Sequence, residues 1–287
     1  MQQLGQHVET TDWDGIWLAD HFMPNAEDTS APWPEAWVTL GALAAVIPRI
    51  RLGTLVTGNT YRHPAILAKM AATLDHISGG RVVLGMGSGW QENEHAKYGI
   101  PFYDVKERLH RLAEACHVIQ SLFTEESTTF AGEFYQLTDA PLVPKPVQSP
   151  LPLMIGGGGE KLTLKITAQY ANEWNVWGTP ETLIHKMKVL DEHCAKLSRD
   201  PADIQRSAVA LLFLSEDQAY LDKMRAQKMA QPTIIGNSSE VKDIIGAYRD
   251  AGVDELIIPD FTMGLGATSQ KKELLDKFMT EAAAEFK

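Results

Sequence analysis

The sequence predicts an α/β protein whose parallel strands close into a (β/α) barrel. Short apolar runs alternate with amphipathic stretches along the whole chain, as in a series of βαβ units. Seven strand candidates follow one another without the isolated dinucleotide-binding half of a doubly wound sheet, which favours the barrel. With 287 residues, 44% of them apolar, the chain can bury one extensive core. We therefore expect a single barrel domain over residues 1–287.

The strands and helices are assigned from this alternation. The predicted strands are residues 15–20, 50–56, 81–86, 153–155, 173–177, 207–214 and 255–259. The predicted helices are residues 34–47, 63–77, 105–123, 181–197, 240–251 and 271–286. Pro64 opens the second of these helices, and the glycines after Ser78 end it by supplying a positive φ.

An insertion around residues 124–152 interrupts the alternation. Residues 128–130 and 134–137 predict a hairpin that turns at Gly132. Five prolines then forbid helix before the next strand: Pro141, Pro144, Pro146, Pro150 and Pro152. We interpret this stretch as an insertion within the barrel and not as a domain linker.

The N-terminus departs from the barrel pattern. An eight-stranded barrel needs a strand before its first helix, yet the chain opens with the helix-like residues 2–10. We therefore expect one barrel strand to be absent from this chain. Either the start codon has been placed late or the barrel closes in an unusual way, because an open barrel would leave two strand edges unpaired.

Composition and charge indicate small-molecule chemistry. A net charge of -11 without a basic stripe excludes nucleic acid and anionic membranes as expected partners. Cys116 and Cys194 have no CxxC spacing, and His193 beside Cys194 has no third partner for a metal. No signal sequence or membrane span is recognisable, so we expect a soluble protein in the reducing cytoplasm.

Four strand ends carry distinctive residues, and reacting groups in barrels of this kind lie at the C-terminal ends of strands. The four segments are Asp20-His21-Phe22, Thr54 to Asn59, Gly85 to Trp90 with the following Asn93-Glu94, and Gly156 to Lys161.

Six ordered motifs in this chain resemble those of the luciferase-like monooxygenase superfamily. They stand at residues 13–22, 49–53, 62–69, 77–81, 85–90 and 157–161. The resemblance covers nearly the whole chain and is closest to the branch of oxidoreductases that use the deazaflavin coenzyme F-420. It implies a luciferase-like TIM barrel whose first strand is missing here, so that residues 15–20 correspond to the family's second strand.

The resemblance implies that His21 is catalytic, contacting the reactive face of the cofactor ring and donating a proton or hydrogen bond during hydride transfer. The alternative is a histidine that fixes a loop. Asp20 is expected to hold the backbone and orient the ring, with general-base chemistry as the alternative role.

The pair Leu55-Val56 coincides with the family's non-proline cis peptide, which forms a bulge behind the central ring. An ordinary barrel strand is the alternative. Thr57 and Asn59 are then expected beside the ring edge as hydrogen-bond donors.

Glycines 156–159 before a helix predict a phosphate site, because glycine lets an anion approach backbone N–H groups at a positive helix end. Lys161 is expected one turn into that helix. An ordinary glycine-rich turn is the alternative: Gly156, Gly157, Gly158 and Gly159 would then bind nothing. The spacing of Gly85, Gly87 and Gly89 matches a dinucleotide fingerprint poorly, since the third glycine comes one residue early.

The remaining predicted cofactor contacts are Gly87, Ser88, Trp90, Asn93 and Trp177. The cofactor's side chain or the substrate entrance is expected to be lined by Trp90, Asn93 and Glu94. The alternative is that Trp90 only covers the strand ends. Sugar-phosphate and alcohol dehydrogenases of the F-420 branch carry glutamate where Trp90 stands, and tryptophan where this chain has Asn25. Their substrates are therefore not carried over.

We expect an enzyme that transfers a hydride between F-420 and a small organic substrate. The alternatives are an FMN-dependent two-component monooxygenase, supplied by a separate flavin or deazaflavin reductase, and a non-catalytic flavin-binding relative. Residues 37–46 predict a helix that is apolar nearly all round, which indicates a homodimer.

Overall fold

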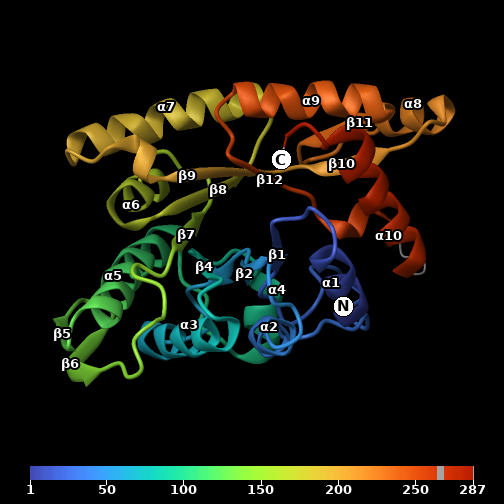
Figure 1. The fold of residues 1–287 in the computed structure, drawn as a ribbon. Coiled ribbons are helices and arrows are strands. Elements are labelled where there is room, and N and C mark those ends of the chain that lie inside the picture. The colour runs from blue at the N-terminus through green and yellow to red at the C-terminus, as the bar shows by residue number, and fades with distance from the viewer. Residues whose placement is uncertain (264–267, 287) are drawn as a thin grey trace. The chain divides into compact units, whose positions relative to one another are not determined.

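The computed structural model describes residues 1–263 and 268–286, and the chain divides into two compact units. Unit 1 comprises residues 1–13, 157–168 and 173–287, and unit 2 comprises residues 14–156 and 169–172. Both units combine parallel strands with helices, as the alternating sequence pattern predicts (Figure 1). The expected single domain over residues 1–287 stays a prediction.

Unit 2 is built on a parallel sheet. Its strands run in the order β1 (Gly15–Leu18), β2 (Arg51–Thr54), β4 (Val82–Gly87) and β7 (Leu153–Gly156), with β3 (Thr57–Gly58) beside β4. Every residue of β4 is buried. Such continuous apolar burial is typical of a central parallel strand that is covered on both faces.

The helices of unit 2 are α2 (Ala36–Ala44), α3 (Pro64–Ser78), α4 (Glu92–Tyr98) and α5 (Val105–Thr124). Helix α3 begins as predicted at Pro64, where His63 Nδ1 accepts a hydrogen bond from the backbone N–H of Ala65 at 3.2 Å. It ends at Gly79, which has a φ of 68°. Helix α4 was not predicted, and it carries part of the candidate site.

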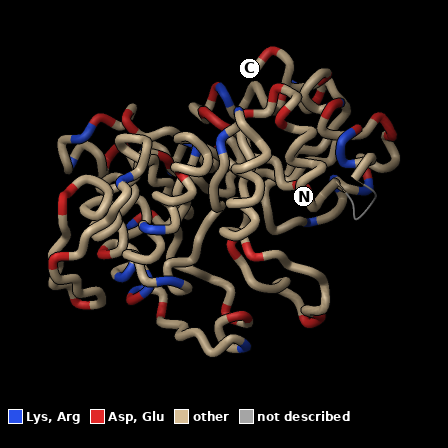
Figure 2. The backbone as a smooth tube through the Cα atoms, turned by 60° about the horizontal axis from the view of Figure 1, so that its bottom comes forward, with Lys and Arg blue, Asp and Glu red and all other residues tan. Residues whose placement is uncertain are grey.

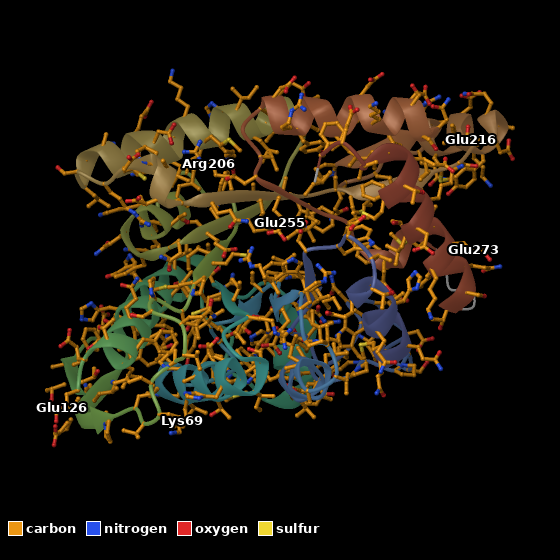
Figure 3. All side chains as sticks on the ribbon, in the orientation of Figure 1. Lys69, Glu126, Arg206, Glu216, Glu255 and Glu273 are labelled. Atoms are coloured by element: carbon orange, nitrogen blue, oxygen red, sulfur yellow. The ribbon has the colours of Figure 1, made fainter. Side chains whose placement is uncertain are left out.

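The predicted insertion forms the antiparallel hairpin of β5 (Ser127–Ala131) and β6 (Gln136–Pro141). Glu114 on α5 fixes the turn, since its carboxylate accepts the backbone N–H groups of residues 133–135 at 2.7–3.1 Å. Glu126, labelled in Figure 3, lies directly before this hairpin, and Lys69 on α3 donates to the carbonyl oxygen of Val143 beyond it. These contacts tie the insertion to α5 and α3.

Unit 1 contains two sets of parallel strands. Strands β8 (Glu173–Trp177), β9 (Gln205–Val209) and β12 (Glu255–Ile257) pair in the order β8-β9-β12, and β10 (Leu211–Leu214) pairs with β11 (Thr233–Gly236). The single strand predicted at residues 207–214 is therefore wrong, because the ladder breaks at Ala210 and each half has its own partners. Strand β11 was not predicted.

The helices of unit 1 are α1 (Gln2–Glu9), α6 (Thr163–Tyr170), α7 (Pro180–Lys196), α8 (Gln218–Ala226), α9 (Ser238–Asp250) and α10 (Thr268–Lys277). Short 3-10 turns occupy Pro201–Asp203 and Asp260–Met263. The helix predicted to residue 286 changes after α10 into a π-helical turn at Phe278–Ala282. In Figure 1, α7 and α9 lie along one side of the strands of this unit.

Helix α9 begins at a capping box, in which Asn237 and Glu240 each accept a backbone N–H of the other residue. Helix α1 precedes β1 as the sequence predicts, and the absence of a first barrel strand stays a prediction.

No helix within residues 1–263 and 268–286 is long and apolar enough to cross a membrane. Lysines and arginines are scattered among acidic residues along the chain (Figure 2). Cys116 and Cys194 are buried free thiols.

Candidate active site

The candidate site of unit 2 lies in the segments that follow β1, β3 and β4, where the C-terminal ends of parallel strands meet. His21 follows β1, and Glu94 lies on α4 after β4. The Nδ1 atom of His21 lies 2.7 Å from Oε1 of Glu94. The His21 side chain is 14% exposed and that of Glu94 is 0% exposed.

Glu94 also receives two further donors. The hydroxyl of Tyr61 donates to Glu94 Oε1, and the backbone N–H of Phe22 donates to Oε2 at 2.8 Å. Burial, the hydrogen bond to Glu94 and the charge of Glu94 raise the pKa of Tyr61 well above its ordinary value. Tyr61 is therefore a hydrogen-bond donor throughout the working pH range.

Asp20 makes a second buried pair beside His21. Its fully buried carboxylate accepts two hydrogen bonds from Arg62, at 2.6 and 3.2 Å. Arg62 also donates to Glu35 at 2.6 Å, and Glu35 in turn caps the first turn of α2. Asp20 thus connects the end of β1, through Arg62 and Glu35, to the start of α2. Its role towards a cofactor ring stays a prediction.

The peptide bond between Leu55 and Val56 is cis, as the family resemblance implies. The side chain of Val56 packs between two glycines: a Cβ added at Gly87 or at Gly156 would lie 2.9 Å from a Val56 methyl group. Both glycines are therefore required by close packing against Val56. Ser88, half-buried after β4, has no role that its surroundings assign.

Thr57 and Asn59 occupy the predicted place after the cis bond. Trp37 Nε1 donates to Thr57 Oγ1 at 3.1 Å, so this hydroxyl is already used within the protein. Asn59 is 3% exposed, and its Nδ2 donates to the Tyr135 hydroxyl at 3.1 Å. Its Oδ1 is buried and has no hydrogen-bond partner among the described residues. Such an orphaned acceptor is unusual and indicates a place for a ligand donor.

Trp90 lies at an open hollow that Asn25, Gln91, Glu92 and Asn93 also line. The Trp90 side chain is 60% exposed, and its ring meets the ring of His21 edge to face at 5.2 Å between centroids. Asn93 donates to the carbonyl oxygen of Pro24 at 3.4 Å, which ties α4 to the segment after His21. Trp90 is thus beside His21, and Asn93 is linked to the segment that follows His21.

Of the predicted phosphate loop, residues 156–159, Gly156 ends β7 in unit 2 and residues 157–159 belong to unit 1. Gly157 has a φ of 123°, its N–H donates to Asn175 O at 2.9 Å, and its carbonyl accepts Trp174 Nε1 at 2.8 Å. The N–H groups of Gly158 and Gly159 have no hydrogen-bond partner within residues 1–263 and 268–286. Two free adjacent donors are what an anion site needs.

One expectation for this loop is wrong. Lys161 does not lie inside a helix, because residues 160–162 form a turn and α6 begins only at Thr163. That turn is held through Glu160, whose carboxylate lies 2.6 Å from Lys186 Nζ and whose carbonyl oxygen lies 2.8 Å from His193 Nε2.

Trp177 ends β8 and is 40% exposed. No group of three or more His, Cys, Asp or Glu side chains in the described part of the chain could hold a metal ion.

Three residues of the site had no assigned role in the sequence analysis: Tyr61, Arg62 and Glu35. Arg62 stands in one of the family motifs, and Tyr61 precedes it directly. The sequence feature that could have marked Tyr61 and Arg62 as site residues is a hydroxyl or charged side chain just after a strand end. Their partners, however, are separated from them by 27 to 42 residues and cannot be paired from the sequence.

Comparison with known proteins identifies the family. A family model described as luciferase-like monooxygenase matches residues 1–227. The chain is 39% identical over 160 residues to an F-420-dependent glucose-6-phosphate dehydrogenase of Amycolatopsis mediterranei (strain U-32), covering 55% of this chain and 46% of that protein. The chain thus spans about half the length of the curated relatives it matches.

Solved structures share the fold. An F-420-dependent secondary alcohol dehydrogenase in complex with an F-420–acetone adduct matches 90% of this chain and 87% of its own, with a TM-score of 0.80 and 22% identity. The monooxygenase RslO1 from Streptomyces bottropensis matches 100% of this chain and 92% of its own, with a TM-score of 0.82 and 17% identity. The predicted luciferase-like α/β barrel class is therefore confirmed.

Proposed function

This chain belongs to the luciferase-like monooxygenase family, and we propose that it is an oxidoreductase that transfers a hydride between coenzyme F-420 and a small organic substrate. The observation that carries the proposal is the pairing of His21 with the buried Glu94 at the end of a barrel strand. A histidine fixed in this way is suited to exchange a proton while a hydride moves. The F-420-dependent relatives in the comparison support the choice of cofactor.

Each unit, taken by itself, contains groups that suit one part of a deazaflavin. The buried Asn59 Oδ1 could accept an N–H from the ring, and the free N–H groups of Gly158 and Gly159 suit a phosphate. Bound F-420 would supply the centre that gives or takes the hydride. Further contacts proposed from the sequence are Asp20, Leu55, Val56, Thr57, Gly87, Ser88, Trp90, Asn93, Gly156, Gly157 and Trp177.

His21 is the proposed catalytic residue. Its Nδ1 is bound to Glu94, and no described residue forms a hydrogen bond with its Nε2. If the substrate is an alcohol, Nε2 accepts the hydroxyl proton as the adjacent carbon loses its hydride; in the reverse direction, Nε2 returns that proton. Trp90 and Asn25 replace the glutamate and tryptophan of the sugar-phosphate and alcohol dehydrogenases, so their substrates are not proposed here.

A homodimer is proposed from α2. Trp37, Leu40 and Leu43 of this helix are buried, and yet Val38 on its outer face is 77% exposed. An exposed apolar side chain on a helix that is otherwise apolar suits a second copy of the chain.

The test is to titrate the purified protein with F-420 and with FMN under identical conditions, and to follow binding by the fluorescence of each cofactor. We expect F-420 to bind at least tenfold more tightly, and the F-420-loaded protein to exchange hydride with at least one compound of a panel of small organic substrates. Tighter FMN binding with oxygen-dependent turnover would favour the two-component monooxygenase. Binding of either cofactor without any turnover would favour a non-catalytic relative.

A further inference from the structure

The buried Glu94 carboxylate of unit 2 is contacted by groups from three residues. Three groups meet on this one carboxylate: His21 Nδ1 and the Tyr61 hydroxyl at Oε1, and the backbone N–H of Phe22 at Oε2. The Tyr61 hydroxyl also lies 3.4 Å from His21 Nδ1. The carboxylate is 0% exposed, so water does not compete with these donors. Neither Glu94 nor Tyr61 needs to touch a substrate to affect His21.

We propose that Glu94 and Tyr61 are positioning residues for His21: Glu94 holds the imidazole proton on Nδ1, which leaves Nε2 as the atom that exchanges protons, and Tyr61 holds the Glu94 carboxylate in place. The inference rests on the proposed function in that it gives His21 its catalytic role. The hydrogen-bond geometry that carries it lies within the protein alone.

The role of Glu94 follows from the chemistry of the two partners. A neutral imidazole carries one proton, which can lie on either ring nitrogen, and an ionised carboxylate can only accept. Beside an ionised Glu94, the Nδ1 atom of His21, 2.7 Å from Oε1, is the donor. The lone pair of the neutral ring then lies on Nε2.

The role of Tyr61 follows from its fixed and protonated side chain. Its ring stacks on His95 at 5.0 Å between centroids and meets Phe22 edge to face at 4.9 Å. The raised pKa of Tyr61 keeps the hydroxyl a donor. Because Tyr61 and His21 donate to the same oxygen of Glu94, each hydrogen bond weakens the charge available to the other.

The other charged groups nearby are engaged elsewhere. Asp20 is paired with Arg62, whose guanidinium lies 5.9 Å from the centre of the Phe22 ring. His95 is bound through Nδ1 to the carbonyl oxygen of Gln91 and through Nε2 to Thr60, both at 2.7 Å. Among the described residues, Glu94 is the carboxylate that contacts His21.

The first experiment labels the histidine rings with ¹⁵N and identifies the protonated ring nitrogen of His21 in the cofactor-free protein. The measurement is made near pH 9, where an ordinary histidine is neutral. We expect the wild-type proton on Nδ1. In Glu94→Gln, the position should become a mixture of both forms or shift to Nε2, because the amide no longer requires a donor. The control Glu92→Gln removes a charge from the same helix at an exposed position and should leave the proton on Nδ1.

The second experiment uses Tyr61→Phe, which keeps the carboxylate and so tests the proposal even if Glu94→Gln fails to fold. The proton should stay on Nδ1. Its ¹H resonance should move downfield, because Glu94 Oε1 then accepts a hydrogen bond from His21 alone and that bond becomes stronger. The control is Tyr98→Phe. Tyr98 also packs its ring on Phe22, and removing its hydroxyl should leave the His21 resonance in place.

A wild-type proton on Nε2, or a proton that stays on Nδ1 in a folded Glu94→Gln protein, would overturn the role of Glu94. An unmoved resonance in Tyr61→Phe would overturn the role of Tyr61. These signals come from the cofactor-free protein, so they are independent of whether F-420 is the cofactor. Failure of F-420 to bind would overturn the proposed function, and the NMR signals of the cofactor-free protein would still be those expected here.

Discussion

The surroundings of His21 in unit 2 and the glycine loop in unit 1 are built in opposite ways. Around His21, two carboxylates that are 0% exposed, Glu94 and Asp20, are each bound by charged or hydroxyl side chains. Around the loop, the charged side chains are partly exposed, with Glu160 at 40% and Lys186 at 22%. The loop offers backbone N–H groups at Gly158 and Gly159 in place of side chains.

This difference separates two ways of making a site. Buried charges must be paired because an uncompensated carboxylate in the interior is costly, so the pairs near His21 fix both geometry and stability. A backbone anion site depends on unhindered N–H groups and small residues, and its surface charges contribute little to folding. Substitutions in the two regions should therefore affect different measurements.

The largest effect on folding is expected from Arg62→Met. The change leaves Asp20 buried without its bidentate partner and should lower the free energy of unfolding by about 3–5 kcal/mol. Urea unfolding at neutral pH measures this loss. A loss below about 1 kcal/mol would mean that Asp20 finds water or another donor, and that the pair is not a structural requirement.

Gly158→Asp should act on binding. It places a negative charge and a side chain beside the free N–H groups, and its added Cβ would lie 3.0 Å from a methyl group of Val176. We expect the affinity for F-420 to fall by more than tenfold in titrations. Asparagine has nearly the same shape as aspartate without the charge, so Gly158→Asn should lose clearly less affinity for F-420 than Gly158→Asp does. Equal losses in both variants would indicate a steric effect, and unchanged affinity in a folded Gly158→Asp protein would remove the loop from the site.

The smallest effect is expected from Lys186→Met, which breaks the ion pair with Glu160 at 2.6 Å but keeps an apolar chain of similar length beside Gly158. Because the Glu160 side chain is partly exposed and water screens the pair, the loss in the free energy of unfolding should be much smaller than in Arg62→Met. Measured alongside Arg62→Met, this variant compares a surface ion pair with a buried one. A loss as large as that of Arg62→Met would contradict the distinction between the two regions.

The sequence predicted the regular parts of the fold well, because strand and helix alternation follows from local periodicity. Helix α3 is an example, with a proline at its start and a glycine after its end. The strand predicted at residues 207–214 failed at Ala210, where distant partners β11 and β12 decide the pairing. Periodicity carries no information on such partners.

The candidate site was predictable to a smaller extent. The residues at strand ends, such as His21 and Asn59, could be named because the barrel fold fixes where reactive groups lie. Their partners could not be named: Tyr61 meets Glu94 across 33 residues, and Arg62 meets Asp20 across 42. The position of Lys161 before α6 was missed because a turn held by long-range contacts delays the helix.

The most direct test of the proposed function is His21→Ala, assayed for both F-420 binding and turnover. The control His110→Ala removes an exposed histidine from α5 and should change neither quantity. We predict that His21→Ala binds F-420 within a few-fold of the wild type while its turnover falls by roughly a hundredfold, the usual scale for one positioned acid–base group. A folded His21→Ala protein that turns over its best substrate at the wild-type rate would contradict the assignment of His21 as the catalytic residue.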